Sequence, residues 1–145
     1  MVELRQAIQK DRNFLYKLKK KTLKEYIQKT WGWDEEWQKD YHIQNFKPEL
    51  LKIIIKSGKK IGCFSIIEEE DRFFLSVIEI LPKYQKQGIG TGLITELLSK
   101  ARKRNKSVYL QVLRHNERAQ KLYKNLGFSR VSDTDTHYKM VYNKR

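Results

Sequence analysis

The sequence predicts an α/β fold, built on one central, mostly antiparallel twisted sheet with helices on both faces. An apolar run over residues 73–81 passes through a glycine-containing turn, residues 85–90, into a segment with helical periodicity. The apolar runs before that turn are separated only by short polar stretches, which is the pattern of an antiparallel meander. No repeat, low-complexity tract or linker interrupts the chain, so residues 1–145 are expected to form a single domain.

The elements before the turn follow from periodicity and from capping residues. Residues 2–7 alternate enough for a first strand, and Asp11 can cap a helix that extends to about residue 30. Asp34 and the two glutamates after it supply the acidic first turn of a second helix that ends near residue 44. Three strands are then expected, over residues 51–55, 61–68 and 73–81.

After the turn, one apolar stripe predicts a helix, and its members are Leu93, Ile94, Leu97, Leu98 and Ala101. Residues 108–113 form the next strand, and residues 117–126 form the last helix, which Gly127 closes. Residues 129–133 and 136–143 are expected to be strands. The predicted order is therefore β-α-α-β-β-β-α-β-α-β-β.

Composition limits the environment and the partners. No apolar run approaches the roughly 20 residues of a membrane span, and the first ten residues lack the apolar core of a signal peptide, so a cytoplasmic protein without membrane association is expected. The net charge of +14 favours a polyanionic partner, either nucleic acid or a cofactor with several phosphates. The lysines are spread over every predicted helix, which makes nucleic acid the less favoured of the two.

Cysteine and histidine usage excludes two kinds of site. Cys63 is the single cysteine and lies within an apolar run, so it is expected to be a buried strand residue that takes part in no intramolecular disulfide. His42, His115 and His137 lack the spacing of metal ligands, and no metal is expected.

The glycine-containing turn is expected to hold a pyrophosphate. Gly88 and Gly90 remove side chains where the backbone could approach a bulky anion, and the unpaired N–H groups of the following helix would point at it. A P-loop would need a Gly-Lys-Ser/Thr ending, which is missing. A dinucleotide fold would need its glycines after the first strand of a βαβ unit, and this turn comes late in the chain.

Two segments resemble the GNAT superfamily of N-acetyltransferases. Gln85, Gly88 and Gly90 match its Gln/Arg-x-x-Gly-x-Gly/Ala loop. A second match begins at Tyr109 and follows the family's strand, asparagine-capped helix and terminal Gly-Phe, through Leu110, Gln111, Val112, Leu113, Asn116, Ala119, Leu122, Tyr123, Gly127 and Phe128. The first half of the chain matches in its element order. The resemblance implies a GNAT-like fold, acetyl-coenzyme A (acetyl-CoA) as cosubstrate and direct acetyl transfer to a primary amine, in a monomer or homodimer.

The resemblance also implies where the cofactor binds. The backbone of Ile78 and Ile80 would pair with the pantetheine amides as an added strand would. Asn116 would contact the pantetheine or phosphate arm, and it can equally cap the last helix. The phosphate loop and the first turn of its helix would comprise Gln85, Lys86, Gln87, Gly88, Ile89, Gly90 and Thr91.

Two residues are candidates for the chemistry. A lysine-like amine costs roughly 4.6 kcal/mol to deprotonate at pH 7, so a base is useful. Glu79 is the charged residue in an otherwise apolar strand, and it is expected to take the amine proton directly or through water, unless it pairs with a lysine across the sheet. By resemblance, Tyr123 protonates the coenzyme A sulfur; the alternative is an aromatic that packs in the core. Gln111 stands where some family members carry a catalytic glutamate, which argues against the branch that acetylates ribosomal proteins.

An aromatic and acidic segment is a candidate acceptor site. In this fold the connection between the first two helices borders the acceptor pocket, and aromatic faces beside carboxylates favour a cation. A cationic small molecule, or an amine of a protein, is therefore a candidate acceptor, with Trp31, Trp33, Asp34 and Glu35 as its contacts. The alternative is that the tryptophans pack the second helix onto the sheet and the acids satisfy its N-terminus.

A function of a different class is also consistent with the charge. The chain could be a basic, non-catalytic binding module on the same fold that engages nucleic acid or a protein partner.

Overall fold

The structure is a computed structural model that describes residues 2–143. Its strands form a seven-stranded sheet in the order β1-β2-β3-β4-β5-β7-β6. Their bounds are β1 (Glu3–Gln6), β2 (Lys52–Lys56), β3 (Lys59–Glu68), β4 (Arg72–Ile80), β5 (Ser107–Leu113), β6 (Ser129–Asp133) and β7 (His137–Tyr142). β4 and β5 pair in parallel, whereas β1 with β2, β2 with β3, β5 with β7 and β6 with β7 pair antiparallel. The predicted mixed, mostly antiparallel sheet is confirmed.

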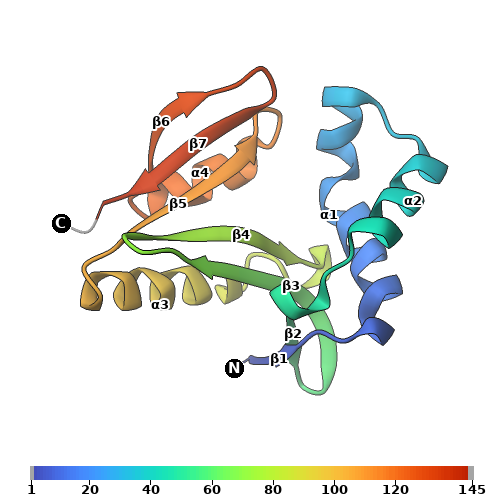
Figure 1. Ribbon diagram of the computed structural model, residues 1–145, viewed down its shortest axis with the longest axis horizontal. Coiled ribbons are helices and arrows are strands. Elements are labelled where there is room, and N and C mark those ends of the chain that lie inside the picture. Colours follow the sequence, from blue (N-terminus) through green and yellow to red (C-terminus); the bar gives the residue numbers. More distant parts are fainter. Residues whose placement is uncertain (1, 144–145) are drawn as a thin grey trace. The chain divides into compact units, whose positions relative to one another are not determined.

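Four α-helices accompany the sheet in the described part of the chain: α1 (Arg12–Trp31), α2 (Glu35–Asn45), α3 (Ile89–Lys103) and α4 (Glu117–Asn125). The order of helices and strands along the chain is the predicted one, and Figure 1 follows it from the N-terminal strand to the β6–β7 hairpin. Within residues 2–143, none of the helices has both the length and the apolar character that crossing a bilayer requires.

The chain divides into two compact units. Unit 1 comprises the residues up to Ser65 together with Val77–Gln87, and unit 2 comprises Ile66–Ser76 together with the residues from Gly88 onward. β3 and β4 each run through both units, so the division cuts across strands and does not coincide with a linker. The expected single domain over residues 1–145 stays a prediction.

In unit 1, α1, β2, β3 and the residue that follows β1 pack around an apolar core. This core contains Ala7, Leu15, Leu18, Ile53 and Cys63. The cysteine is 2% exposed, which confirms the expectation that it is a buried strand residue. α1 ends at Trp31, and Gly32 follows with a φ of 85°. α2 begins directly after Asp34, whose side chain accepts a hydrogen bond from the Trp37 N–H at 3.0 Å, so this residue caps the helix and the two glutamates form its acidic first turn.

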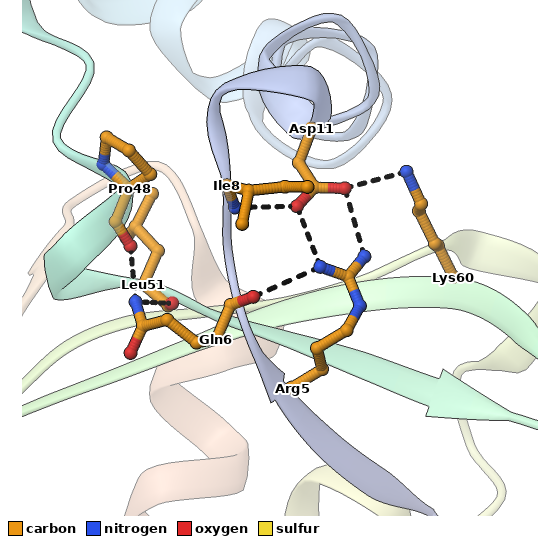
Figure 2. A network of polar contacts seen from close by, with 7 residues as sticks. All are labelled: Arg5, Gln6, Ile8, Asp11, Pro48, Leu51 and Lys60. Atoms are coloured by element: carbon orange, nitrogen blue, oxygen red, sulfur yellow. Dashed lines mark hydrogen bonds and ion pairs between the residues drawn. The ribbon is translucent and has the colours of Figure 1, made fainter.

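Asp11 does not cap α1 with its side chain, contrary to the prediction. The carboxylate is 1% exposed and accepts two hydrogen bonds from Arg5, at 3.0 Å each, and one from Lys60 at 2.7 Å. The Ile8 N–H donates a further one at 2.8 Å. Figure 2 shows both cations facing this carboxylate. Its oxygens are therefore occupied by β1, β3 and the turn before the helix, and the network ties these elements to the start of α1.

In unit 2, β5 alternates between a buried and a more open face over most of its length. Val108, Leu110 and Val112 of β5 are buried, and Gln111 between them is exposed. α3 contributes the whole predicted stripe to the interior, from Leu93 to Ala101. β7 lies between β5 and β6, so the last hairpin places its second strand inside the sheet and its first strand at the edge. Gly127 closes α4 with a φ of 102°, as predicted.

Candidate active site

The glycine-containing turn joins β4 to α3 as predicted. After β4, a short 3-10 turn over Pro82–Tyr84 leads into the loop, and α3 begins at Ile89 with Gly88 at the N-cap position. Lys86 and Gly88 have φ values of 61° and 82°, in the left-handed region. This conformation is uncommon for a residue such as lysine, and strained residues of this kind concentrate at binding sites. Gly88 has no side chain to cap α3, so the first N–H groups of the helix are left for another acceptor.

The space beside Gly88 is open, which suits an anion. A Cβ built on this glycine would meet no atom within 4 Å. The first N–H groups of α3 and the positive end of its dipole therefore border a space that a phosphate could enter. Phosphate oxygens would be acceptors for N–H groups that the protein itself does not cap.

Side chains of the loop hold its shape. Gln85 donates from Nε2 to the Ile80 carbonyl at 2.7 Å, which fixes the loop to the end of β4. Gln87 donates from Nε2 to the Lys83 carbonyl at 3.3 Å and accepts from Lys56 Nζ at 2.9 Å. Lys56 belongs to β2, and no sequence pattern indicates that it reaches this loop.

Glu79 on β4 is half-buried. Burial raises the pKa of its carboxyl from 4.5 to about 7, and the positive charge of Lys19 on α1 acts in the opposite direction. Burial in turn lowers the pKa of Lys19, whose Nζ lies 5.5 Å from the centre of the Tyr41 ring on α2. The positive charge that acts on Glu79 thus comes from a lysine of helix α1. The alternative to a catalytic role had been a pair with a lysine on another strand of the sheet. A carboxyl with a pKa near 7 suits a general base at neutral pH.

A glycine on β3 sets the backbone position of Glu79. A Cβ built on Gly62 would lie 2.3 Å from the Glu79 carbonyl oxygen and 3.2 Å from the Ile80 Cα. The neighbouring Leu81 N–H donates to the Ile61 carbonyl at 2.8 Å, so the two strands remain paired there. A side chain at residue 62 would push β4 away from β3 at the candidate base. Sequence reasoning missed this role, although a glycine inside a strand often marks a close backbone approach.

In unit 2, α4 carries the other two predicted site residues. Asn116 caps the helix, because its Oδ1 accepts from the Ala119 N–H at 3.1 Å. Tyr123 is 8% exposed, and its ring lies 5.9 Å from that of Phe128 at an angle of 59°. The Phe128 N–H also donates to the Tyr123 carbonyl at 3.0 Å. The tyrosine is thus held firmly at the end of α4, as either the catalytic or the packing interpretation requires.

The expected acceptor segment makes strong contacts within unit 1. Glu35 accepts hydrogen bonds from Tyr16 Oη at 2.5 Å and from Trp33 Nε1 at 3.0 Å, and it pairs with Lys20 at 2.7 Å. Hydrogen bonds from Lys20, Tyr16 and Trp33 lower the pKa of Glu35 to about 2. Lys24 Nζ lies 5.7 Å from the centre of the Trp33 ring. The acid and this tryptophan therefore already engage cations of α1, and Asp34 caps α2. Trp31 is 59% exposed.

Comparison with known proteins places these features in a family. The profile described as "Acetyltransferase (GNAT) family" matches residues 13–128. The [Ribosomal protein bS18]-alanine N-acetyltransferase of Haemophilus ducreyi is 33% identical over 106 residues, which are 72% of this chain and 73% of that protein. The protein of the same name from Escherichia coli K12 is 28% identical over 104 residues, 70% of either chain.

A solved structure shows the same fold. The PaiA N-acetyltransferase of Thermoplasma acidophilum, crystallised in complex with coenzyme A, superimposes with a TM-score of 0.79. The alignment covers 99% of both chains at 17% sequence identity. The curated relatives above carry the name of the branch that Gln111 argues against.

Proposed function

This chain belongs to the acetyltransferase (GNAT) family and is an acetyl-CoA-dependent N-acetyltransferase, and we propose that its acceptor is the N-terminal α-amino group of a protein. The names of the curated relatives support this acceptor class, since they describe N-acetylation of an alanine of a ribosomal protein. The net charge of +14, which suggested a non-catalytic basic module, is also accounted for by a cosubstrate with several phosphates.

The observation that carries the proposal is the similarity to proteins named as alanine N-acetyltransferases, and the raised pKa of Glu79 agrees with it. An α-amino group has a pKa near 8, so freeing it from its proton at pH 7 costs about 1 kcal/mol, against roughly 4.6 kcal/mol for a lysine side chain. A carboxylate whose pKa is about 7 is well matched to the first of these tasks. Glu79 is proposed as the general base, either directly or through one water molecule.

The proposed cofactor site is built largely from main-chain groups. The N–H groups of the loop from Gln85 to Gly88, and those of Ile89, Gly90 and Thr91, would hold the pyrophosphate. The backbone of Ile78 and Ile80 would pair with the pantetheine amides. Asn116 uses Oδ1 for its cap, which leaves its Nδ2 to donate to the cofactor. When bound, acetyl-CoA supplies the activated acetyl group.

Tyr123 is proposed to donate a proton to the departing thiolate. Replacing it by phenylalanine keeps the ring that packs against Phe128 and removes the hydroxyl. Because a thiol has a pKa near 8.5, the thiolate is a fair leaving group without help, and we expect kcat to fall about 10- to 100-fold while the Kd for acetyl-CoA stays within about twofold. Steady-state kinetics and calorimetry measure the two quantities. An unchanged kcat would remove Tyr123 from the mechanism and leave its packing role.

The alternative acceptor is a cationic small molecule bound by Trp31, Trp33, Asp34 and Glu35. The structure gives it less support, because Glu35 and the Trp33 ring contact lysines of α1 and Asp34 caps α2. If the acceptor is a ribosomal or newly made protein, the reaction would take place in the cytoplasm and would need neither nucleic acid nor a membrane. The enzyme is proposed to act as a monomer or homodimer.

An acceptor assay tests the proposal directly. The purified protein would be incubated with acetyl-CoA and one of three acceptors: a lysine-free peptide with a free N-terminal alanine, the same peptide with a blocked N-terminus and one lysine, or spermidine. Mass spectrometry then locates the acetyl group. We expect transfer to the free α-amine at neutral pH. Transfer to spermidine or to the lysine, with none to the α-amine, would contradict the proposal.

A further inference from the structure

Lys56 brings a cation from another part of the chain to the proposed phosphate loop. It is the last residue of β2, and its Nζ lies 2.9 Å from Gln87 Oε1. Gln87 is anchored in turn, because its Nε2 donates to the Lys83 carbonyl at 3.3 Å. Lys56 is half-buried, so its side chain is not simply extended into solvent. The contact joins residues 31 positions apart in sequence.

The hairpin that follows β2 determines where this lysine lies. Ser57 and Gly58 have φ values of 51° and 77°, and this pair of left-handed residues makes the tight turn between β2 and β3. β2 therefore ends at Lys56 and presents the side chain at the edge of the turn. The side-chain oxygen Oε1 of Gln87 accepts one of the three protons of the ammonium group, which leaves the others to donate elsewhere.

We propose that Lys56 is an acetyl-CoA-binding residue that places a positive charge beside the pyrophosphate, and that Gln87 holds it in position. The inference rests on the proposed role of the loop as the phosphate site. A charged donor to a phosphate oxygen makes a stronger bond than a neutral one, and a lysine can serve as a point charge for phosphate. The loop N–H groups would supply shape and direction, while Lys56 would supply charge.

The chain contains a close control for this residue. Lys52 lies on the same strand, four residues earlier, and its Nζ also donates to a glutamine oxygen, Gln6 Oε1, at 3.0 Å. Lys52→Met and Lys56→Met remove the same charge and the same kind of hydrogen bond from β2. They differ in whether the glutamine partner belongs to the phosphate loop, and Lys52 is exposed whereas Lys56 is half-buried.

Calorimetry with acetyl-CoA tests the inference. We expect Lys56→Met to raise the Kd about tenfold, Lys56→Arg to keep it close to the parent value, and Lys52→Met to leave it unchanged. The same variants would be measured with S-acetylpantetheine, which lacks the pyrophosphate and the nucleotide, by ligand-observed NMR. There Lys56→Met should bind as the parent does.

Two results would overturn the inference. Either Lys56→Met binds acetyl-CoA as tightly as Lys52→Met, or it loses acetyl-CoA and S-acetylpantetheine to the same extent, as a merely distorted site would. Neither result contradicts the proposed function, provided that the parent protein binds acetyl-CoA. A folded parent that fails to bind acetyl-CoA would instead reject the loop assignment itself, and the role of Lys56 with it.

Discussion

Replacing Glu79 by glutamine should lower kcat by about 10²- to 10⁴-fold, the usual worth of a positioned general base. The substitution keeps the size of the side chain and removes its ability to accept a proton. In the parent enzyme the rate should rise as pH increases through about 7, because the base must be deprotonated to act. The variant should lose this rise and retain only the titration of the acceptor amine. Initial rates between pH 5.5 and 9 measure both effects.

Lys19, whose charge acts on Glu79, provides a second test of the role of Glu79 as the base. The positive charge of Lys19 lowers the pKa of Glu79, so Lys19→Met should raise that pKa and move the rise in rate to higher pH. Glu70→Gln, at an exposed carboxylate in the turn between β3 and β4, is the control and should change neither rate nor profile. A Glu79→Gln enzyme with the parent's kcat and pH profile would show that another group takes the proton.

Folding of the Glu79→Gln variant should not be impaired. Because the pKa of Glu79 is raised above its unfolded value, its contribution to stability is present below pH 4.5 and is lost as pH rises through about 7. The charged form is therefore the unfavourable one, and a neutral glutamine avoids it. At pH 8 the variant should be at least as stable as the parent, which separates a catalytic defect from an unfolding one.

The largest expected effect on stability comes from Asp11. Breaking a buried ion pair commonly costs 3–5 kcal/mol. Arg5 and Lys60 keep 37% and 41% of their side chains exposed, so they can return to water when the carboxylate is removed. We therefore expect Asp11→Ala to lower the free energy of unfolding by about 3 kcal/mol, towards the low end of that range. Urea denaturation at pH 7 gives the value, and a single transition would support the one-domain prediction.

A surface pair serves as the control for this stability effect. Glu25 and Lys29 lie 3.5 Å apart on α1 with side chains 70% and 55% exposed, so Glu25→Ala should cost less than about 0.5 kcal/mol. Hydrogen bonds from Arg5 and Lys60 hold the pKa of Asp11 well below 3.8. The contribution of Asp11 to the free energy of unfolding is present above that pH and is lost as pH falls below it. The difference in stability between the parent and Asp11→Ala should therefore become smaller in acid. Equal stabilities of the two variants at pH 7 would contradict the structural role of Asp11.

Local signals in the sequence predicted much of the fold. Hydrophobic periodicity gave each helix and strand to within a few residues, and Asp34, Asn116 and Gly127 end or begin helices as expected. These features depend on residues only a few positions apart. The position of β7 between β5 and β6 depends on pairing at longer range, which periodicity does not encode.

The features of the candidate site also differ in whether they depend on short-range or long-range contacts. The glycine turn and the isolated Glu79 could be recognised from neighbouring residues alone. The contact of Lys56 with Gln87, the close approach of Gly62 to Glu79 and the burial of Asp11 join segments that are distant in sequence. Asp11 shows why such features are missed. It has the residue type and spacing of a helix cap, but its carboxylate oxygens accept hydrogen bonds from Arg5 on β1 and Lys60 on β3.

Calorimetry of acetyl-CoA binding to the parent, Gly88→Asn and Gly88→Asp tests the central claim, that the loop holds the pyrophosphate. Gly88 has a φ of 82° and open space beside it, and asparagine and aspartate tolerate this conformation about equally, so the two variants differ chiefly in charge. We expect the parent to bind, and Gly88→Asp to bind at least about tenfold more weakly than Gly88→Asn, because its carboxylate would face the phosphates. Equal affinities of the two variants, or no binding by a folded parent, would contradict the account.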